Sequence, residues 1–180
     1  MHTTLFDGQL TVMVGDITQL EADVIVNAAN SSLLGGGGVD GAIHRAAGRK
    51  LLQACQAVRE HDWPEGLPTG EVALTPGFDL PARYIIHTVG PVYSASQDRS
   101  TELAACYRNA LALADIKNMR SIAFPAISTG IYGYPREAAS KIILKVMEEE
   151  LPRRPELAVT LCFFNEADAD LFLDIAEGKR

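Results

Sequence analysis

Six short apolar runs are distributed along the chain, and several are too continuously apolar for a sheet with one wet face. They cover residues 10–14, 24–28, 72–75, 84–89, 121–125 and 158–164. Between the later runs, apolar residues recur at helical spacing, first at Leu103, Tyr107, Leu111 and Ala114 and then at Ile142, Val146 and Met147. Alternating strands and helices predict an α/β fold, in which helices cover both faces of a largely parallel sheet.

Local signals mark several helix ends. Pro135 suits the first turn of a helix, Pro152 ends the helix that Leu151 closes, and Asn165 is a suitable N-cap for the last helix. The chain has 180 residues, 47% of them apolar, which suffices for one sizeable core but is short for two. With no internal repeat or interdomain linker, residues 1–180 are expected to form a single domain.

Charge and composition exclude several classes of partner. The net charge of −7 argues against a general binder of nucleic acid or of anionic membranes. There is no basic segment followed by a long apolar run near residue 1, and no run of eighteen apolar residues, so we expect a soluble, cytoplasmic protein. The three cysteines, Cys55, Cys106 and Cys162, form no short-spaced pair and are expected to be reduced core residues rather than disulfides or zinc ligands.

Residues 24–48 have the outline of a binding site. An apolar strand leads into four consecutive glycines and then into a helix, and Asn27, Asn30 and Asp40 are the strongly polar side chains before the basic His44 and Arg45. Glycines let backbone N–H groups approach a ligand closely, while two amides and one carboxylate remain to orient it. A carboxylate beside a backbone anion cradle predicts a phosphorylated ligand that is hydrolysed as well as held.

Two familiar phosphate motifs fit this loop poorly. Gly36, Gly38 and Gly41 form a G-x-G-x-x-G, but residues 30–34 separate them from the strand and the next strand begins only near residue 72, so a dinucleotide fingerprint is rejected. No Gly-Lys-Ser or Gly-Lys-Thr follows, which excludes a P-loop.

A second loop, residues 124–135, again joins a strand to a helix through small residues. Loops at the carboxyl ends of neighbouring parallel strands flank one crevice, so both sets of N–H groups are placed to grip a diphosphate. Tyr132 lies between two glycines and is available to pack against a sugar or base. Asp16 follows the first apolar run; it accepts a hydrogen bond from an adenine amine or caps a turn with Thr18, and the pattern favours neither reading.

With these pieces in place, the chain resembles the macro domain family, specifically its MacroD-type branch of ADP-ribose-binding hydrolases, which includes O-acetyl-ADP-ribose deacetylases. The matching segments occur in order and span most of the chain: GDIT at 15–18, VIVNAAN at 24–30, GGGGVDGAIHRAAG at 35–48, HTVGP at 87–91 and ISTGIYGYP at 127–135.

The resemblance implies a three-layer α/β/α sandwich with a mixed, largely parallel central sheet and ADP-ribose across its crest. Asp16 and the Ile17 backbone would bind adenine, Asn30 would position the distal ribose, and Asp40 would be the acid of the reaction. The diphosphate would lie between two loops, which contribute Gly37, Gly38 and Val39 from one side and Ser128, Thr129, Gly130, Ile131 and Tyr132 from the other.

The predicted reaction is hydrolysis of an ester on the distal ribose by an ordered water that Asp40 orients or deprotonates, with Asn30 as its companion. The substrates would be O-acetyl-ADP-ribose or proteins carrying mono-ADP-ribose on aspartate or glutamate. No serine or cysteine looks activated, and neither a cofactor nor a metal is expected. Two alternatives stay open, a non-catalytic reader of ADP-ribose and a phosphatase for ADP-ribose 1″-phosphate. Cleavage of poly-ADP-ribose is disfavoured, because its hydrolases place adjacent glutamates after the glycine loop.

Three polar residues have structural readings at least as good as functional ones. Asn27 is read as satisfying neighbouring backbone groups on its strand, with ligand contact as the alternative. His44 lies one helical turn after Asp40, yet a packing or surface histidine is the commoner case. His87 lies in an apolar run and is read as a hydrogen-bonded core histidine.

Two further pairs are ambiguous. Arg45 and Arg49 either steer an anionic ligand or form a solvated helix face. Phe163 and Phe164 end the last apolar run, where core packing is favoured over contact with adenine.

Overall fold

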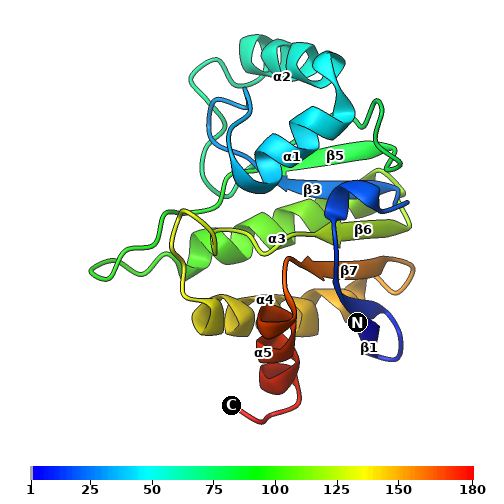
Figure 1. Ribbon diagram of the computed structural model, residues 1–180, viewed down its shortest axis with the longest axis vertical. Helices are drawn as coiled ribbons and strands as arrows, with labels where there is room; N and C mark the ends of the chain where they lie inside the picture. The colour runs from blue at the N-terminus through cyan, green and yellow to red at the C-terminus, as the bar shows by residue number, and fades with distance from the viewer. Residues whose placement is uncertain (1) are drawn as a thin grey trace.

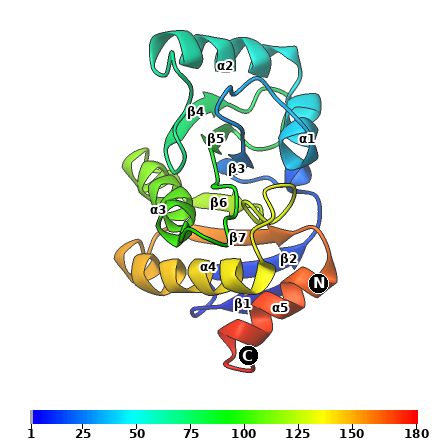
Figure 2. The same ribbon diagram turned by 90° about the vertical axis from the view of Figure 1, so that its left-hand side faces the viewer.

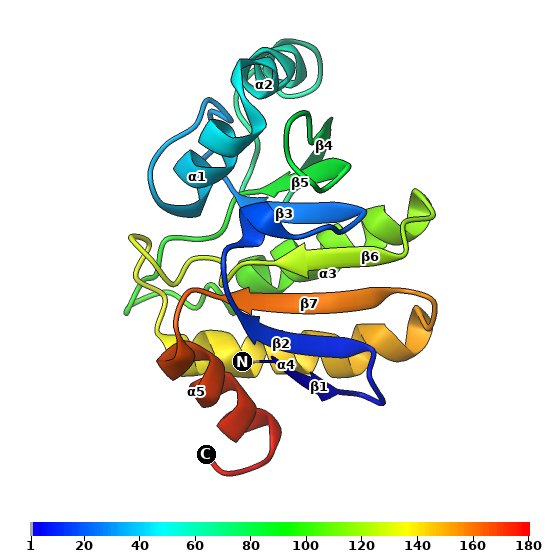
Figure 3. The same cartoon turned by 45° about the vertical axis from the view of Figure 1, so that its right-hand side comes forward.

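A seven-stranded mixed sheet runs through the middle of the molecule in the computed structural model, which describes residues 2–180. Its order is β1-β2-β7-β6-β3-β5-β4, and Figure 3 shows the strands side by side in this order. The five central strands, β2, β7, β6, β3 and β5, run parallel to one another. The edge strands β1 and β4 are antiparallel to their neighbours β2 and β5. The strands are β1 His2–Leu5, β2 Leu10–Val14, β3 Val24–Ala28, β4 Val72–Pro76, β5 Tyr84–Thr88, β6 Ser121–Phe124 and β7 Ala158–Phe163.

Helices cover both faces of the sheet, which gives the expected three-layer α/β/α sandwich (Figure 2). One core cluster joins the sheet to α3, α4 and α5, and a second cluster joins the opposite face to α1 and α2. The helices are α1 Gly38–Ala47, α2 Arg49–His61, α3 Ser100–Ile116, α4 Arg136–Glu150 and α5 Glu166–Ala176, with 3₁₀ turns at Ile17–Gln19 and Leu151–Arg153.

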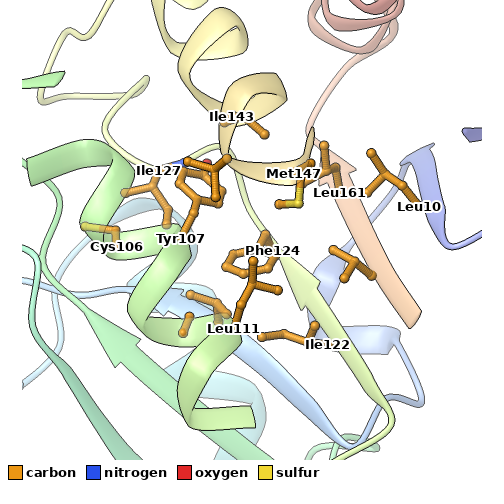
Figure 4. Close-up of a cluster of buried hydrophobic side chains, with 14 of the residues drawn as sticks. Leu10, Cys106, Tyr107, Leu111, Ile122, Phe124, Ile127, Ile143, Met147 and Leu161 are labelled. Carbon is orange, nitrogen blue, oxygen red and sulfur yellow. The ribbon is translucent and has the colours of Figure 1, made fainter. Parts of the chain in front are cut away.

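Strand alternation sorts side chains between these two clusters. On β3, Val24 and Val26 face α3 and α4 while Ile25 faces α1, and β6 and β7 alternate in the same way. Burial on both faces explains why the sequence shows continuous apolar runs. Figure 4 shows the larger cluster, where Tyr107 and Phe124 pack with ring centroids 5.0 Å apart.

All six predicted strands are present, with ends that differ from the prediction by at most one residue. The sequence did not predict β1, because its residues HTTL are exposed or half-exposed and form no apolar run. Pro135 is the N-cap of α4 rather than a first-turn residue, since its ψ of 132° is extended and the helix begins at Arg136. Asn165 caps α5 as predicted, with its side chain accepting from the N–H of Asp168. Among residues 2–180, no helix has the length and apolar character needed to cross a membrane.

Gln9 anchors the turn between β1 and β2 to the segment before β7. Its Nε2 lies within hydrogen-bond distance of three carbonyl oxygens, those of Leu151 (3.2 Å), Arg154 (2.8 Å) and Leu157 (3.0 Å). Replacing it removes the side-chain donor that joins the turn to this segment; the Leu151 and Arg154 carbonyls keep backbone donors of their own.

We therefore expect Gln9→Ala to lower the free energy of unfolding by about 1–2 kcal/mol, measured by urea denaturation. Gln19→Ala, at an exposed position, is the matched control and should change it by less than about 0.5 kcal/mol. Equal stability of the two variants would contradict the role of Gln9.

Candidate functional site

A cleft of about 840 Å³ opens at the edge of the sheet where the parallel strands end. Residues that follow β2, β3, β5, β6 and β7 all line it, as expected for an open parallel sheet. The loop after β3 and the loop after β6 leave this same edge (Figure 1). A volume of this size is typical of sites for ligands as large as a nucleotide sugar.

The loop after β3 is organised by Asn30 and by one close backbone approach. Asn30 Nδ2 donates to the Gly35 carbonyl (3.0 Å), and its Oδ1 accepts from the N–H of Ser32 (3.0 Å). A Cβ on Gly41 would lie 2.4 Å from the Gly36 carbonyl oxygen, so only glycine lets the first turn of α1 pack against the loop. This contact holds Asp40, the preceding residue, against the cleft.

Asp40 is a buried carboxylate in the first turn of α1. Asn27 Nδ2 donates to its Oδ1 (2.8 Å), and His44 Nε2 lies 3.5 Å from the same oxygen. The other oxygen, Oδ2, and Asn30 Nδ2 both border Gly36, within 3.2 and 3.3 Å of where its Cβ would be. Burial raises the pKa of the Asp40 carboxyl above its ordinary value of 3.8, while the Asn27 bond and His44 oppose the rise.

Behind Asp40, Asn27 belongs to a row of polar side chains across three adjacent strands. Asn27 Nδ2 is 3.1 Å from His87 Nδ1, and His87 Nε2 is 2.9 Å from Thr75 Oγ1. Asn27 and His87 are fully buried. Burial lowers the pKa of His87 to about 3, and His44 adds to this effect, so the ring is neutral near pH 7.

The loop after β6 is fixed at its base from the core. The buried Tyr107 hydroxyl donates to the Pro125 carbonyl (3.2 Å) and accepts from the N–H of Ile127 (3.1 Å). Ser128 Oγ donates to the Pro91 carbonyl (2.7 Å). The serine hydroxyl is therefore committed to holding the loop, which leaves backbone groups to face a ligand. Within residues 2–180, no hydrogen bond occupies the N–H groups of Gly130, Ile131 or Tyr132.

Asp16 follows β2 and also lines the cleft. Its Oδ1 accepts from the N–H (2.9 Å) and hydroxyl (2.7 Å) of Thr18, so the predicted capping role is confirmed. No hydrogen bond to Oδ2 is found within residues 2–180. Phe163 is in the core at 4% exposure, but Phe164 is 92% exposed and lines the cleft. The prediction of core packing is therefore confirmed for Phe163 and wrong for Phe164. Successive side chains along a strand point to opposite faces, so Phe164, just after the end of β7, points away from the core that holds Phe163.

The cysteines offer no activated nucleophile. All three are free and buried, as predicted. Burial raises the pKa of the Cys55 thiol to about 12, with a further contribution from the charge of Asp40, and burial raises those of Cys106 and Cys162 to about 11. A thiolate is therefore scarce in each case near pH 7. In the part of the chain that the structure describes, no three His, Cys, Asp or Glu side chains gather as a metal site.

The structure brings every sequence-predicted site residue to this one cleft. The lining includes Asp16, Ile17, Asn30, Gly37, Gly38, Val39, Asp40, Ser128, Thr129, Gly130, Ile131 and Tyr132. Arg45 also lines it and Arg49 does not, although both lie on exposed helix surface. His87 is a hydrogen-bonded core histidine, as predicted, and His44 is half-buried beside Asp40.

Two outcomes differ from the sequence prediction. Asn27 was expected to satisfy backbone groups, but its side chain bonds to Asp40 and His87, because β3 points it at the first turn of α1. Arg136 and Asp168 were not predicted; they pair at 2.9 Å and line the cleft beside Phe164. Their positions, at the starts of α4 and α5, carry no motif that indicates a shared location.

Comparison with known proteins decides the family. The Macro domain family model matches residues 26–143. The chain belongs to the macro domain family. It is 52% identical over 161 residues to the O-acetyl-ADP-ribose deacetylase of Escherichia fergusonii, covering 88% of this chain and 90% of that protein.

Solved macrodomains have the same fold. A variant of the Oceanobacillus iheyensis macrodomain with ADPR is 48% identical, with a TM-score of 0.94 over 99% of this chain and 97% of the other. A Trypanosoma brucei macrodomain in complex with ADP-ribose is 42% identical, with a TM-score of 0.85 over 93% of this chain and 69% of the other.

The raised pKa of Asp40 has a consequence for stability. A group whose pKa is higher in the folded than in the unfolded protein favours folding below its unfolded pKa, and that contribution is lost as pH rises through the folded pKa. Ionised Asp40 therefore costs stability at pH 7. Asp40→Asn keeps an oxygen for the Asn27 bond and removes the buried charge.

We expect Asp40→Asn to unfold at higher urea concentration than the wild type at pH 7, and the difference to shrink as pH falls toward 3.8. Asp170→Asn, at an exposed position of α5, should match the wild type at both pH values. An Asp40→Asn variant that is no more stable than wild type at pH 7 would show that the buried charge of Asp40 does not destabilise the fold.

Proposed function

We propose that this macro domain binds ADP-ribose and hydrolyses an ester on its distal ribose. The observation that carries the proposal is Asp40: a buried carboxylate, held by Asn27 on one oxygen, with the other oxygen beside Gly36 and Asn30 in the cleft. Burying a carboxylate beside a site for an anion costs folding free energy, so its presence there indicates that the carboxylate takes part in the chemistry.

Backbone groups of the two loops supply the proposed diphosphate site. The first turn of α1 leaves the N–H groups of Gly38, Val39 and Asp40 without partners inside the helix, and the positive end of its dipole favours phosphate. Gly130, Ile131 and Tyr132 offer N–H groups from the other loop. Solved relatives with ADPR and ADP-ribose share this fold, which supports the same ligand here.

The ends of the ligand follow from the side chains beyond the loops. We propose that adenine lies near Asp16 and Ile17, where Oδ2 of Asp16 accepts from the exocyclic amine and exposed Phe164 offers a ring face. The distal ribose then lies near Asn30 and Asp40. Arg45 adds a cation to the cleft, which favours an anionic ligand despite the net charge of −7.

In the proposed reaction, a water attacks the ester carbonyl and Asp40 takes its proton. The bond from the acyl carbon to the ribose oxygen then breaks, and Asp40 returns the proton to that oxygen, which leaves as the ribose hydroxyl beside the free carboxylic acid. Asn30 Nδ2 donates one hydrogen to Gly35 and has a second for the ribose. Because a base acts in its ionised form, kcat/KM should fall as pH drops through the raised pKa of Asp40. The name of the Escherichia fergusonii relative supports an acetyl ester as substrate, and mono-ADP-ribosyl esters of protein aspartate or glutamate fit the same cleft.

The decisive experiment compares three substrates: O-acetyl-ADP-ribose, a protein carrying glutamate-linked ADP-ribose, and ADP-ribose 1″-phosphate. We expect turnover of at least one ester and binding of ADP-ribose by calorimetry. Asp40→Ala should lose about 10²- to 10⁴-fold in kcat while still binding ADP-ribose.

Asp170→Ala is the matched control and should keep wild-type turnover, since Asp170 lies on exposed α5 outside the cleft. Binding of ADP-ribose without turnover of any substrate would replace the hydrolase with a reader. Turnover of the phosphate alone would replace it with a phosphatase. Wild-type turnover by Asp40→Ala would remove Asp40 from the mechanism.

A further inference from the structure

We propose that Asn27 and His87 are positioning residues for Asp40: a buried hydrogen-bonded row across β4, β5 and β3 sets the orientation of its carboxylate. The proposal rests on the hydrolase function above. The row consists of Thr75, His87 and Asn27, which lie on adjacent strands on the face that α1 and α2 cover.

Strand register puts the row in place. Asn27 pairs with His87 in the parallel β3–β5 ladder, and β4 brings Thr75 to the same face one strand further on. Their neighbours on this face are apolar, among them Ile25, Ile85 and Ala73. A polar row through an apolar cluster is expensive unless its members satisfy one another. Here the row ends on Asp40.

With the Asn27 amide in the observed orientation, the hydrogen bonds of the row have one consistent assignment; Asn27 Oδ1 is the atom of the row that has no partner among residues 2–180. Asn27 Nδ2 has two hydrogens and reaches both Asp40 Oδ1 (2.8 Å) and His87 Nδ1 (3.1 Å). An amide donates to a ring nitrogen only if that nitrogen carries no proton, so the proton of the neutral ring is on Nε2 and points to Thr75 Oγ1 (2.9 Å). In this assignment His87 accepts the second hydrogen of the Asn27 amide, while the first is donated to Asp40.

The reversed amide is disfavoured by Asp40. It would set Asn27 Oδ1 against the ionised Oδ1 of Asp40, where the observed orientation places a donor. With the observed orientation, Asp40 Oδ1 is held from behind and Oδ2 borders the cleft at Gly36. The row thus selects which carboxylate oxygen is free for the water.

Several titratable or charged groups surround Asp40, and the test must separate their effects. On α1 itself His44 lies 3.5 Å from Oδ1, and Arg45 lines the cleft. Cys55 on α2 interacts with the Asp40 charge and lies 4.0 Å from His87 Nε2; His87 faces it from β5 through Asn27. All of these remain unchanged when Asn27 alone is replaced.

The first variant is Asn27→Leu, which has nearly the same shape and no donor. Because the lost bond stabilises the ionised carboxylate, the acid limb of the kcat/KM profile should move to higher pH. We expect kcat to fall about 10- to 100-fold, the range for a hydrogen bond to a charged group, with the Kd for ADP-ribose changed less than about 3-fold. A loss of kcat with no movement of the acid limb would show a merely structural role and overturn the proposal.

A pair of variants at His87 tests the row without touching either Asn27 or Asp40. His87→Asn places an amide oxygen near the position of Nδ1 and keeps an acceptor for Asn27, whereas His87→Leu removes it. We expect His87→Asn to keep most of the wild-type kcat and acid limb, and His87→Leu to resemble Asn27→Leu. Equal activity and pH profiles in the two His87 variants would overturn the proposal. This test does not depend on whether Asn27→Leu folds.

A measurement without substrate separates this proposal from the proposed function. The pKa of the Asp40 carboxyl is read from its ¹³C shift during a pH titration of wild type, His87→Asn and His87→Leu. A higher pKa in His87→Leu alone supports the row even where no ester is hydrolysed, which would count against the hydrolase only. An identical pKa in all three proteins overturns the row while leaving hydrolysis to stand on its own assays.

Discussion

The hydrogen bond from Asn27 to Asp40 joins the sheet to the first turn of α1, and the geometry of the cleft depends on it. Asn27 is fixed by strand pairing in β3, and Asp40 follows the glycine loop that leaves that strand. The bond therefore ties the end of the loop back to its beginning. Gly41 makes the closure possible, because its missing Cβ lets α1 pack on the Gly36 carbonyl.

In the function proposed above, the cost of the buried carboxylate in stability is matched by a gain in its basicity. The carboxylate is buried enough for its pKa to rise, yet Asn27 and His44 keep it from being fully isolated. A base with a raised pKa accepts a proton from water more readily than an exposed aspartate does. The buried row of Thr75, His87 and Asn27 adds hydrogen bonds that fix side-chain orientation behind Asp40.

The fold was accessible from the sequence because both faces of the sheet are buried. Double burial produces continuous apolar runs, and these located six of the seven strands. The remaining strand, β1, lies at the edge with exposed threonines, where hydrophobicity carries no signal. Strand order and the antiparallel edges depend on contacts between distant segments, which a single sequence does not encode locally.

The location of the cleft was also predictable, because small residues after two parallel strands indicate loops at one edge. Contacts made across the fold were not. The pairing of Asn27 with Asp40 and His87 depends on side-chain direction. The ion pair between Arg136 and Asp168 joins α4 to α5, two helices that are far apart in the sequence. Phe163 and Phe164 show the same limit of prediction from sequence. They are neighbours in the chain, yet the first is buried in the core and the second is exposed in the cleft.

A crystal structure with bound ADP-ribose tests the central claim most directly. The account predicts the diphosphate between the two loops, the distal ribose beside Asn30, and Oδ2 of Asp40 facing that ribose while Oδ1 stays on Asn27. A complex in which the distal ribose lies away from Asp40, or in which the carboxylate turns from the cleft, would contradict it.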